Sequence, residues 1–389
     1  MKHDYIKAAQ ELDLFSIKEH SPGFIWWHPN GLALLNALKQ AVKEVHEDFN
    51  YEEVKTPNIA SSKLFEISGH LEKFKQNMFL IPFKDQMDYV VRPMSCPNHI
   101  QVYDASNKSY NQLPLKYFEF GEVVRNEASG ALQTLFRMRG FCQDDSHVFS
   151  SKEGMESVLA DFIKMSKLLY EKLGFSEISY QISLRPQERY GDDALWDEAE
   201  NALRQACLSN GISNWIEEEG GGAFYGPKLE LHLKDKLGRS WQCGTIQVDY
   251  VLPERFDLKY LSRENKLERP VILHHAVLGS LERFIGILLE NYGVDLPFNL
   301  SPVQVVVVNV KEDALDYAKE VVSLLKKKGI RVKLLDKNEN LNNKVKQAQS
   351  LHPKQILVLG QKEAQDRVIN VRGEKEKIAL KDYLESFGQ

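Results

Sequence analysis

Hydrophobic and polar positions recur with two different periods along this 389-residue chain. Apolar residues at helical spacing predict helices over residues 1–20, Gly31–Asp48, Glu153–Leu173 and Trp196–Asn210. The apolar run VILHHAVLGSLERFIGILLENY, residues 271–292, is interpreted as one long helix. These segments carry their apolar residues mainly along one side, so we expect them to cover a shared core.

A period of two predicts strands, most clearly between Tyr117 and Phe149. A first strand over about Leu115–Glu127 is rich in aromatic and β-branched residues, and a second begins near Arg137. One face of the second strand would carry Arg137, Arg139, Phe141, Gln143, Asp145 and His147. Such a row is costly to bury unless something binds there, whereas a solvated strand face is the alternative. Arg125 and Glu127, which share a face at the end of the first strand, favour a binding site.

Two further strands are predicted over Lys228–Leu233 and Ser240–Tyr250, after a glycine-rich loop at residues 217–227 that we expect to cover a site. Gln242 and Gln247 have opposite strand parity. Both can face one site only if the strand contains a bulge, which we place at Gly244.

A boundary is predicted near Pro297–Pro302, giving domains at residues 1–296 and 302–389. The second domain begins with VQVVVVNV and follows a β-α-β-α-β order, which is typical of a compact α/β domain with a largely parallel sheet. Residues 302–389 carry a net charge of +5, against −10 for the rest of the chain. A basic module favours an anionic partner such as RNA, and an ordinary solvated surface is the alternative.

The overall composition is that of a globular protein, with 43% hydrophobic and 27% charged residues. No apolar run approaches the length of a membrane span, and we expect no membrane partner. The four cysteines have neither CxxC nor disulfide-rich spacing, so a reducing, cytoplasmic location is expected.

Six separated motifs resemble those of the class II aminoacyl-tRNA synthetases, and within them the threonyl-tRNA synthetase family. They are YEEVKTP with Pro57, FGEVVRNEASGAL with RMRGFCQDDSHVF, HHAVLGSLERF with Arg283, RPMSCPNH, AFYGPK and QCGTIQVDY. The resemblance implies an α+β catalytic domain with a central antiparallel sheet flanked by helices, plus a small α/β anticodon-binding domain. It also implies that threonine is activated by ATP and transferred to the 3′ end of threonine tRNA.

The resemblance assigns ATP-binding positions to Arg125, Glu127, Arg137, Phe141, Gln242, Thr245 and Arg283. Arg125 is similar to the arginine that bridges the α-phosphate and the amino-acid carboxylate, a task suited to its planar fork. Glu127 would accept from the adenine amino group, and Arg137 would hold the γ-phosphate. Phe141 and Arg283 would stack on adenine. Gln143 would meet the adenylate, so Arg125, Gln143 and Arg283 are the expected catalytic residues, and Mg²⁺ would accompany ATP.

Cys96, His147 and His274 resemble the family's zinc ligands, one Zn²⁺ per subunit. Three protein ligands leave a position open for substrate, and in the family the metal binds the threonine amino and hydroxyl groups. The expected threonine-binding residues are Met94, Asp145, Tyr225 and Gln247. Spacing alone does not predict this metal site, and each residue taken separately is better explained as a structural one.

The C-terminal module places Lys337, Asn338, Glu339 and Arg372 where the family contacts the anticodon. Lysines replace the more usual arginines at Lys337 and Lys346, giving point-charge contacts in place of forked ones. Relatives usually carry an N-terminal ubiquitin-like module and an editing domain with a His/Cys cluster; this sequence contains no such cluster, so no editing in cis is expected.

A homodimer is expected, built through Tyr51–Pro57, because this motif forms the subunit interface in the class. The alternative to an enzyme is a synthetase-like paralogue that binds an amino acid or RNA for regulation. Loss of Arg125, Arg283 or a zinc ligand would favour that alternative, and all of them are present.

Overall fold

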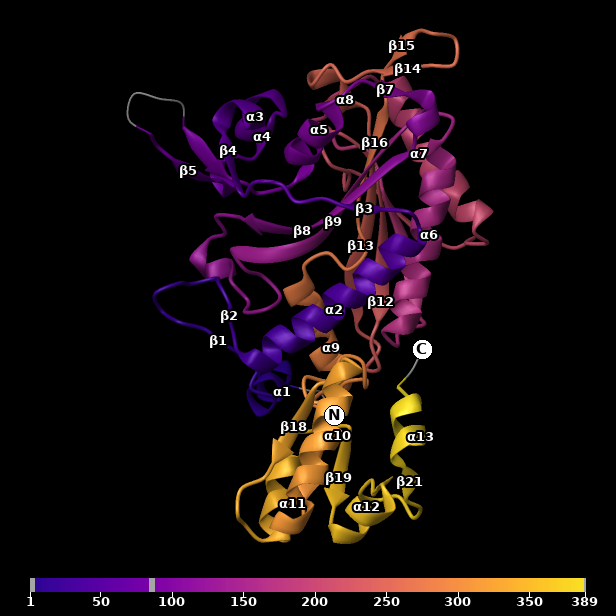
Figure 1. Cartoon of the computed structure of the whole chain (residues 1–389). Coiled ribbons are helices and arrows are strands. Elements are labelled where there is room, and N and C mark those ends of the chain that lie inside the picture. Colours follow the sequence, from indigo (N-terminus) through magenta and orange to yellow (C-terminus); the bar gives the residue numbers. More distant parts are fainter. Residues whose placement is uncertain (1–3, 84–87, 388–389) are drawn as a thin grey trace. The chain divides into compact units, whose positions relative to one another are not determined.

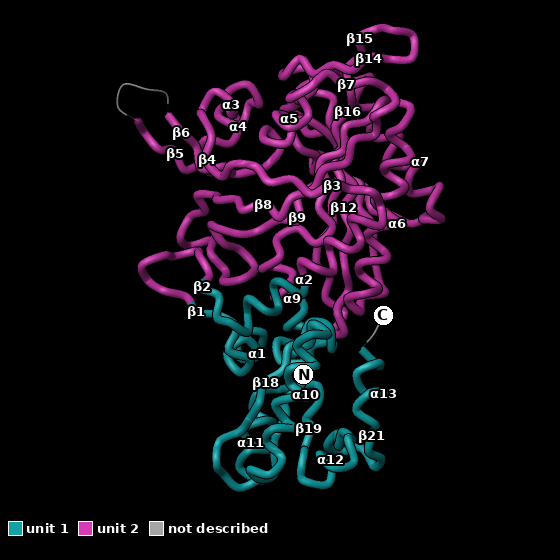
Figure 2. Tube along the Cα trace, in the orientation of Figure 1, with its two compact units in different colours: residues 1–16, 26–37, 288–389 teal, residues 17–25, 38–287 magenta. Residues whose placement is uncertain are grey.

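The computed structural model of the chain describes residues 4–83 and 88–387 (Figure 1). The chain divides into two compact units (Figure 2). The large unit comprises residues 17–25 and 38–287, and the small unit comprises residues 1–16, 26–37 and 288–389. In this division, two N-terminal segments group with the C-terminal part of the chain.

A mixed sheet with the strand order β11-β10-β12-β13-β16-β9-β8-β3 forms the centre of the large unit. Its strands are β3 (Glu52–Glu53), β8 (Leu115–Val124), β9 (Gly140–Ser150), β10 (Ile178–Ser183), β11 (Ile216–Glu218), β12 (Lys228–Lys234), β13 (Ser240–Asp249) and β16 (Val271–Ala276). The inner pairs are antiparallel, and the two edge pairs, β10 with β11 and β3 with β8, are parallel. The predicted fold class, a central antiparallel sheet flanked by helices, is confirmed.

Helices cover both faces of this sheet. They are α2 (Pro29–Asp48), α5 (Cys96–Asp104), α6 (Met155–Lys172), α7 (Asp193–Ser209), α8 (Val251–Arg255) and α9 (Leu281–Tyr292). Helix α6 packs on β9, β13 and β16, and α7 packs on β10 and β12. Phe162 and Ile163 of α6 are fully buried, as its predicted apolar side requires.

Shorter elements complete the large unit. They are β4 (Ile59–Ser61), α3 (Ser62–Ile67), α4 (His70–Lys73), β5 (Phe79–Ile81), β6 (Tyr89–Val91), β7 (Lys108–Ser109), β14 (Tyr260–Leu261) and β15 (Leu267–Glu268). Strands β4, β6 and β5 form a small antiparallel sheet, and β15, β14 and β7 form a small mixed sheet.

The single helix predicted over residues 271–292 is wrong. The run is strand β16, a turn at Gly279 with a φ of +75°, and then helix α9. Every residue of β16 is buried, so the strand shows no polar alternation, and an apolar run of this kind looks the same as a buried helix. As a strand it sends successive side chains to opposite faces: His275 packs on Phe162 of α6, with ring centroids 5.2 Å apart, and His274 points to the other face.

Two other predicted boundaries are also wrong. Residues 1–20 are not one helix, because α1 (Tyr5–Glu11) ends before β1 (Phe15–Ser16), which pairs with β2 (Trp26–Trp27). The second hairpin strand begins at Gly140 and not near Arg137. The backbone N–H of Arg139 donates to the carbonyl of Gly23, so this stretch belongs to the loop.

The bulge predicted in β13 is confirmed. Gln242 pairs with His232 and Gly244 pairs with Leu231, which leaves Cys243 as the extra residue. The bulge reverses the strand's parity at this point. Gln242 and Gln247 can therefore lie on the same face despite their spacing.

The small unit contains a parallel sheet, as predicted. Strand β17 (Val305–Asn309) lies between β18 (Val332–Leu335) and β19 (Gln355–Leu359). The remaining elements are α10 (Leu315–Lys327), α11 (Leu341–Ser350), α12 (Gln361–Asp366), β20 (Val368–Ile369), β21 (Ile378–Ala379) and α13 (Leu380–Glu385). Alternate valines of β17 belong to two different buried clusters, so both faces of the sheet are covered, which explains the uninterrupted apolar sequence.

One buried carboxylate joins the central strand β9 to the turn between β16 and α9. Asp144 is fully buried, and its carboxylate accepts hydrogen bonds from the backbone N–H groups of Val277, Leu278 and Gly279, each at 2.8 Å. The turn that starts α9 is thus fixed to the strand that carries the predicted site residues.

We predict that Asp144→Ala lowers the free energy of unfolding by about 3 kcal/mol or more, because three buried N–H groups lose their acceptor. Urea unfolding followed by circular dichroism measures the change. Glu198→Ala is the control, since it removes a carboxylate that pairs with Lys152 at the surface and should cost less than about 1 kcal/mol. Equal losses in the two variants would contradict the role given to Asp144.

Candidate active site

Cys96, His147 and His274 come together although 51 and 127 residues separate them along the chain. Cys96 is the first residue of α5, His147 lies in β9, and His274 lies in β16 directly opposite His147 in the strand register. One ligand atom from each residue lies within 4.8 Å of the others, and all three side chains are buried. The two imidazole centroids are 4.7 Å apart.

The ring atoms that face the cluster have no other partner among the described residues. His147 Nδ1 lies 2.8 Å from His99 Nδ1, and its Nε2 is buried without a hydrogen bond. His274 Nε2 lies 2.7 Å from an Asp249 carboxylate oxygen, and its Nδ1 is buried without one. Each ring therefore has one nitrogen held and one free, the arrangement of a metal-ligating histidine.

The chemistry of the donor set fits Zn²⁺, which prefers cysteine sulfur and histidine nitrogen. Burial raises the pKa of the Cys96 thiol well above its usual range, and the nearby Asp145 and Asp249 charges add to this effect. A thiol in these surroundings needs an added positive charge, such as a metal ion, to ionise. Three protein ligands would leave one position for another molecule.

The four predicted threonine-binding residues lie beside this cluster. The Tyr225 hydroxyl donates to the Gln247 side-chain oxygen at 2.6 Å, and the Tyr225 and His274 rings are 5.3 Å apart. A carboxylate oxygen of Asp145 lies 3.9 Å from His147 Nδ1. Met94 packs against the buried apolar group that contains Cys96.

A cavity of about 310 Å³ contains the predicted nucleotide residues. Those that line it are Arg125, Glu127, Arg137, Phe141, Gln143, Gln242, Thr245 and Arg283. They come from the loop between β8 and β9, from β9, from β13, and from the start of α9. The Thr245 hydroxyl is buried and has no hydrogen-bond partner among the described residues, so it is available to a ligand.

The cationic groups of the cavity are held in two different ways. The Arg125 guanidinium stacks over the Phe141 ring, 5.2 Å from its centroid, and its Nε donates to the carbonyl of Pro93 at 3.2 Å. Burial lowers the pKa of Arg125, and the negative charge of Asp145 opposes that shift. Arg137 is exposed and pairs with Glu127 at 2.9 Å. The Arg137–Glu127 pair would have to open before each residue could contact ATP as expected.

Buried carboxylates that sequence patterns did not single out fix this cavity in place. Glu282 in the first turn of α9 accepts from the backbone N–H of Cys142 in β9 at 3.0 Å, and burial raises its pKa to about 7. Glu230 of β12 accepts from the Gln242 amide at 2.7 Å. Glu282 and Glu230 bond to residues on other elements of the fold, so their roles depend on how the strands pair and could not be predicted from a local sequence pattern.

The predicted anticodon residues lie in the small unit. Lys337, Asn338 and Glu339 form the loop between β18 and α11, and Arg372 follows β20. The two basic residues are exposed, and Glu339 accepts from Gln347 at 2.7 Å. The structure thus places Lys337 and Arg372 on the surface, where a large anionic partner could reach them.

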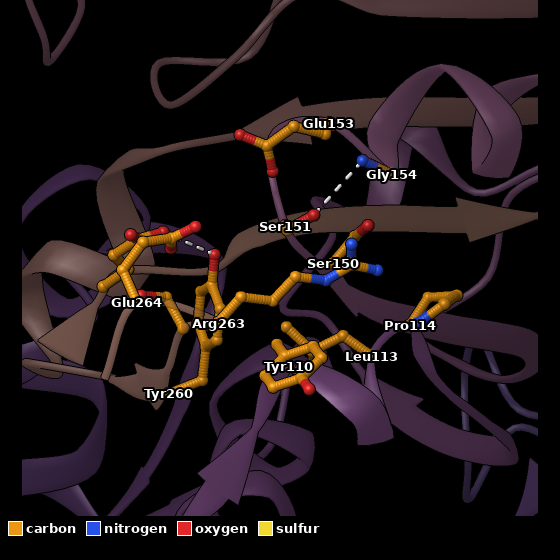
Figure 3. Close-up of a pocket in the computed structure, with 12 residues that line it drawn as sticks. Tyr110, Leu113, Pro114, Ser150, Ser151, Glu153, Gly154, Tyr260, Arg263 and Glu264 are labelled. Carbon is orange, nitrogen blue, oxygen red and sulfur yellow. Dashed lines mark hydrogen bonds between the residues drawn. The ribbon is translucent and has the colours of Figure 1, made fainter. Parts of the chain in front are cut away.

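A larger cavity of about 550 Å³ opens elsewhere in the large unit (Figure 3). Its charged lining residues are Glu153, Arg263, Glu264 and Glu268. Arg263 stacks over Tyr110 at 5.3 Å. Three carboxylates against one guanidinium would repel a triphosphate. None of the predicted site residues lines this cavity.

Residues 79–292 match the class II tRNA synthetase core domain described for the G, H, P, S and T enzymes, and residues 304–386 match an anticodon-binding domain. A prolyl-tRNA synthetase from Giardia lamblia shares the fold, with a TM-score of 0.73 at 18% identity over 98% of this chain and 74% of that one. Fold and site together define a class II aminoacyl-tRNA synthetase.

A solved chain described as the RNA-binding domain of threonyl-tRNA synthetase from Cryptosporidium parvum is 37% identical, with a TM-score of 0.93 over 99% of this chain and 98% of that one. The chain belongs to the threonyl-tRNA synthetase family. Threonine–tRNA ligases of Polynucleobacter necessarius and Cupriavidus necator are each 44% identical over 371 residues, which is 95% of this chain. The chain spans 58% of the length of these curated relatives.

We predict that Cys96→Ala removes bound zinc while the protein stays folded, because the large hydrophobic core does not depend on one ion. Zinc content of the purified, folded protein is measured by atomic emission after dialysis against a weak chelator. The control is Cys207→Ala, which truncates another buried cysteine on α7, away from the cluster. Zinc retained by Cys96→Ala, or lost from Cys207→Ala, would contradict the ligand assignment.

Proposed function

We propose that this chain activates L-threonine with ATP and transfers the threonyl group to the 3′ end of threonine tRNA. One observation carries the proposal: a single face of β9 presents Phe141 and Gln143 to the nucleotide cavity and His147 to the metal cluster, with Asp145 between them. A strand advances about 3.3 Å per residue, so nucleotide and amino acid would meet near the middle of this face.

In the first step, a carboxylate oxygen of threonine attacks the α-phosphorus of ATP. A new O–P bond forms, the bond to the bridging α–β oxygen breaks, and pyrophosphate leaves. Mg²⁺ bound with ATP would offset part of the phosphate charge. Arg125, half-buried between the two ends of the site, would hold the α-phosphate and the threonine carboxylate at once and offset the charge that develops there. Phe141 and Arg283 would stack on adenine, and Arg137 would hold the γ-phosphate after leaving Glu127.

Four further polar side chains would complete the nucleotide contacts. Glu127 would accept from the adenine amino group, and Gln143 would meet the adenylate. Gln242 and Thr245 line the same cavity, one oriented by Glu230 and the other with a hydroxyl that has no partner among the described residues. A buried unpartnered hydroxyl is stabilised once a ligand bonds to it.

At the other end of the face, zinc held by Cys96, His147 and His274 would supply a Lewis-acidic centre for the amino and hydroxyl groups of threonine. Asp145 would accept the hydroxyl proton in a hydrogen bond. Tyr225, oriented by its bond to Gln247, would contact the amino group, and Met94 would form a wall of the pocket. A polar site of this kind rejects an analogue that lacks the polar group.

The small unit would bind the anticodon loop through Lys337, Asn338, Glu339 and Arg372. The positive surplus of residues 302–389 supports a contact with RNA. We also propose a cytoplasmic location, supported by four buried cysteines that are all free thiols. Among the described residues, no helix has the length and apolar character to cross a membrane.

We predict that threonine supports exchange of pyrophosphate into ATP. The kcat/KM for serine should be about 10- to 200-fold lower than for threonine, and the kcat/KM for valine should be lower by about 10⁴-fold or more. Serine lacks only a methyl group, whereas valine lacks the hydroxyl that the site is built to bind. The measurement is the ratio of kcat/KM for the three amino acids with zinc-loaded protein.

Arg125→Ala is the negative control for this measurement, since it should abolish pyrophosphate exchange with every amino acid. No exchange by a folded, zinc-loaded preparation would remove the enzyme assignment. If valine is activated as efficiently as serine, the enzyme assignment is kept, but the proposal that the metal selects threonine is rejected.

We expect a twofold-symmetric homodimer built through Tyr51–Pro57. Strand β3 within this segment is the edge of the large sheet, and an edge strand left open is a site for pairing or cover. Light scattering coupled to size exclusion at micromolar concentration should give the mass of two chains. A monomeric mass across a dilution series starting at that concentration would contradict the interface.

A further inference from the structure

A second line of buried polar groups lies behind the metal cluster, between α5 and β8. His99 of α5 stands between His147 and Glu119 of β8. His99 Nδ1 is 2.8 Å from His147 Nδ1, and His99 Nε2 is 3.2 Å from a Glu119 carboxylate oxygen. All three residues are fully buried.

The direction of these hydrogen bonds follows from the groups around Glu119. Its carboxylate accepts from the Thr56 N–H at 3.0 Å, from the Thr56 hydroxyl at 2.7 Å and from the Arg92 guanidinium at 3.0 Å. Burial favours protonation of Glu119, but the bonds from His99, Arg92 and Thr56 outweigh it and hold its pKa well below the usual range. An ionised carboxylate only accepts hydrogen bonds, so His99 Nε2 carries the hydrogen that lies between them.

The position of the hydrogen on His99 then determines the tautomer of His147. A neutral imidazole with hydrogen on Nε2 offers Nδ1 as an acceptor. With His99 neutral, the hydrogen in the 2.8 Å contact between the two Nδ1 atoms then belongs to His147, which donates to His99. This leaves a lone pair on His147 Nε2, the buried atom that has no partner among the described residues and faces the cluster.

We propose that His99 and Glu119 are positioning residues that fix the tautomer and ring orientation of His147, so that its Nε2 is presented to the metal. The proposal rests on the proposed zinc role of the cluster and adds to it. Neither residue touches the ligand atoms. Asp249 does the same for His274 by direct contact at 2.7 Å, so each histidine has its own carboxylate, one direct and one acting through His99.

The chain of contacts also reaches the predicted subunit interface. Thr56, which bonds to Glu119 through both its backbone and its hydroxyl, follows β3 within Tyr51–Pro57. The segment expected to bind the second subunit and the ligand His147 are thereby joined through two side chains.

A purely structural role for His99 predicts something different. If the ring only fills space and pairs with Glu119, two substitutions of the same branched shape should affect metal binding equally. Leucine and asparagine each have four side-chain heavy atoms that branch at Cγ, and neither reaches as far as the imidazole Nε2. Only asparagine carries an oxygen near the place of the histidine Nδ1, where it can accept from His147.

The test measures zinc affinity of the full chain by competition with a chromophoric chelator. His99→Leu should weaken binding by about 10- to 100-fold, the usual effect of losing such a partner, and His99→Asn should recover most of it. Equal affinities for the two variants would overturn the proposal, whether they match the wild type or fall together.

Cys96→Ala separates this proposal from the one on which it rests. If Cys96→Ala binds zinc like the wild type, the metal site itself is wrong. If Cys96→Ala loses zinc while the His99 variants do not differ from one another, only the positioning role fails.

A second measurement needs no substitution and covers the case in which His99→Leu does not fold. Long-range ¹H–¹⁵N spectra of zinc-loaded wild type, labelled at its 11 histidines, report which ring nitrogens carry hydrogen. His147 should show hydrogen on Nδ1 and metal on Nε2, with hydrogen on Nε2 of His99. Metal on Nδ1 of His147, or hydrogen on Nδ1 of His99, would overturn the proposal.

Discussion

The pairing of β9 with β16 and β8 is the constraint on which the rest of the large unit depends. It places His147 opposite His274 on one side and Tyr117 on the other. A slip of one residue would turn each side chain of β9 to the opposite face, moving the cluster residues into the core. Asp144 opposes such a slip from the reverse face, because its three hydrogen bonds fit only one position of the turn before α9.

The site divides along this strand into two ends with different chemistry. One end is a cavity with guanidinium groups, an aromatic face and amides, suited to a nucleotide. The other is a buried cysteine–histidine cluster with a carboxylate and a phenol beside it, suited to a metal and a small polar molecule. Arg125 lies close enough to feel the charges of both Glu127 and Asp145, which makes it the natural link between the ends.

Burying so many ionisable groups is costly unless each has partners, and the fold provides them. Glu119 is paired with Arg92 and His99, Asp249 with His274 and two backbone N–H groups, and Glu282 with a backbone N–H of β9. These carboxylates orient side chains and loops, and none of the three lines the cavity of about 310 Å³. A rigid frame of this kind is needed where a reacting carboxylate must be held near one phosphorus atom.

The sequence by itself determined the local pattern. The alternation along β9, the bulge near Gly244 and the parallel order of the small unit all follow from spacing and side-chain type, and they agree with the structure. The motifs also led to residues that the structure brings together around the cavity of about 310 Å³. The prediction from sequence was wrong where the local pattern was ambiguous. The apolar run over residues 271–292 has no polar alternation, so the sequence pattern does not show that it divides into a strand and a helix.

The motifs named Cys96, His147 and His274, but only the tertiary structure decided that these three residues meet and which residues support them. Cys96, His147 and His274 lie on three elements far apart in the chain, and nothing in their spacing links them. The pairing of β9 with β16 and the packing of α5 against β9 bring them within reach of one another. The roles of His99, Glu119 and Asp249 depend on contacts of about 3 Å between buried side chains. Such contacts are fixed by the summed packing of the whole core, which no local stretch of sequence contains.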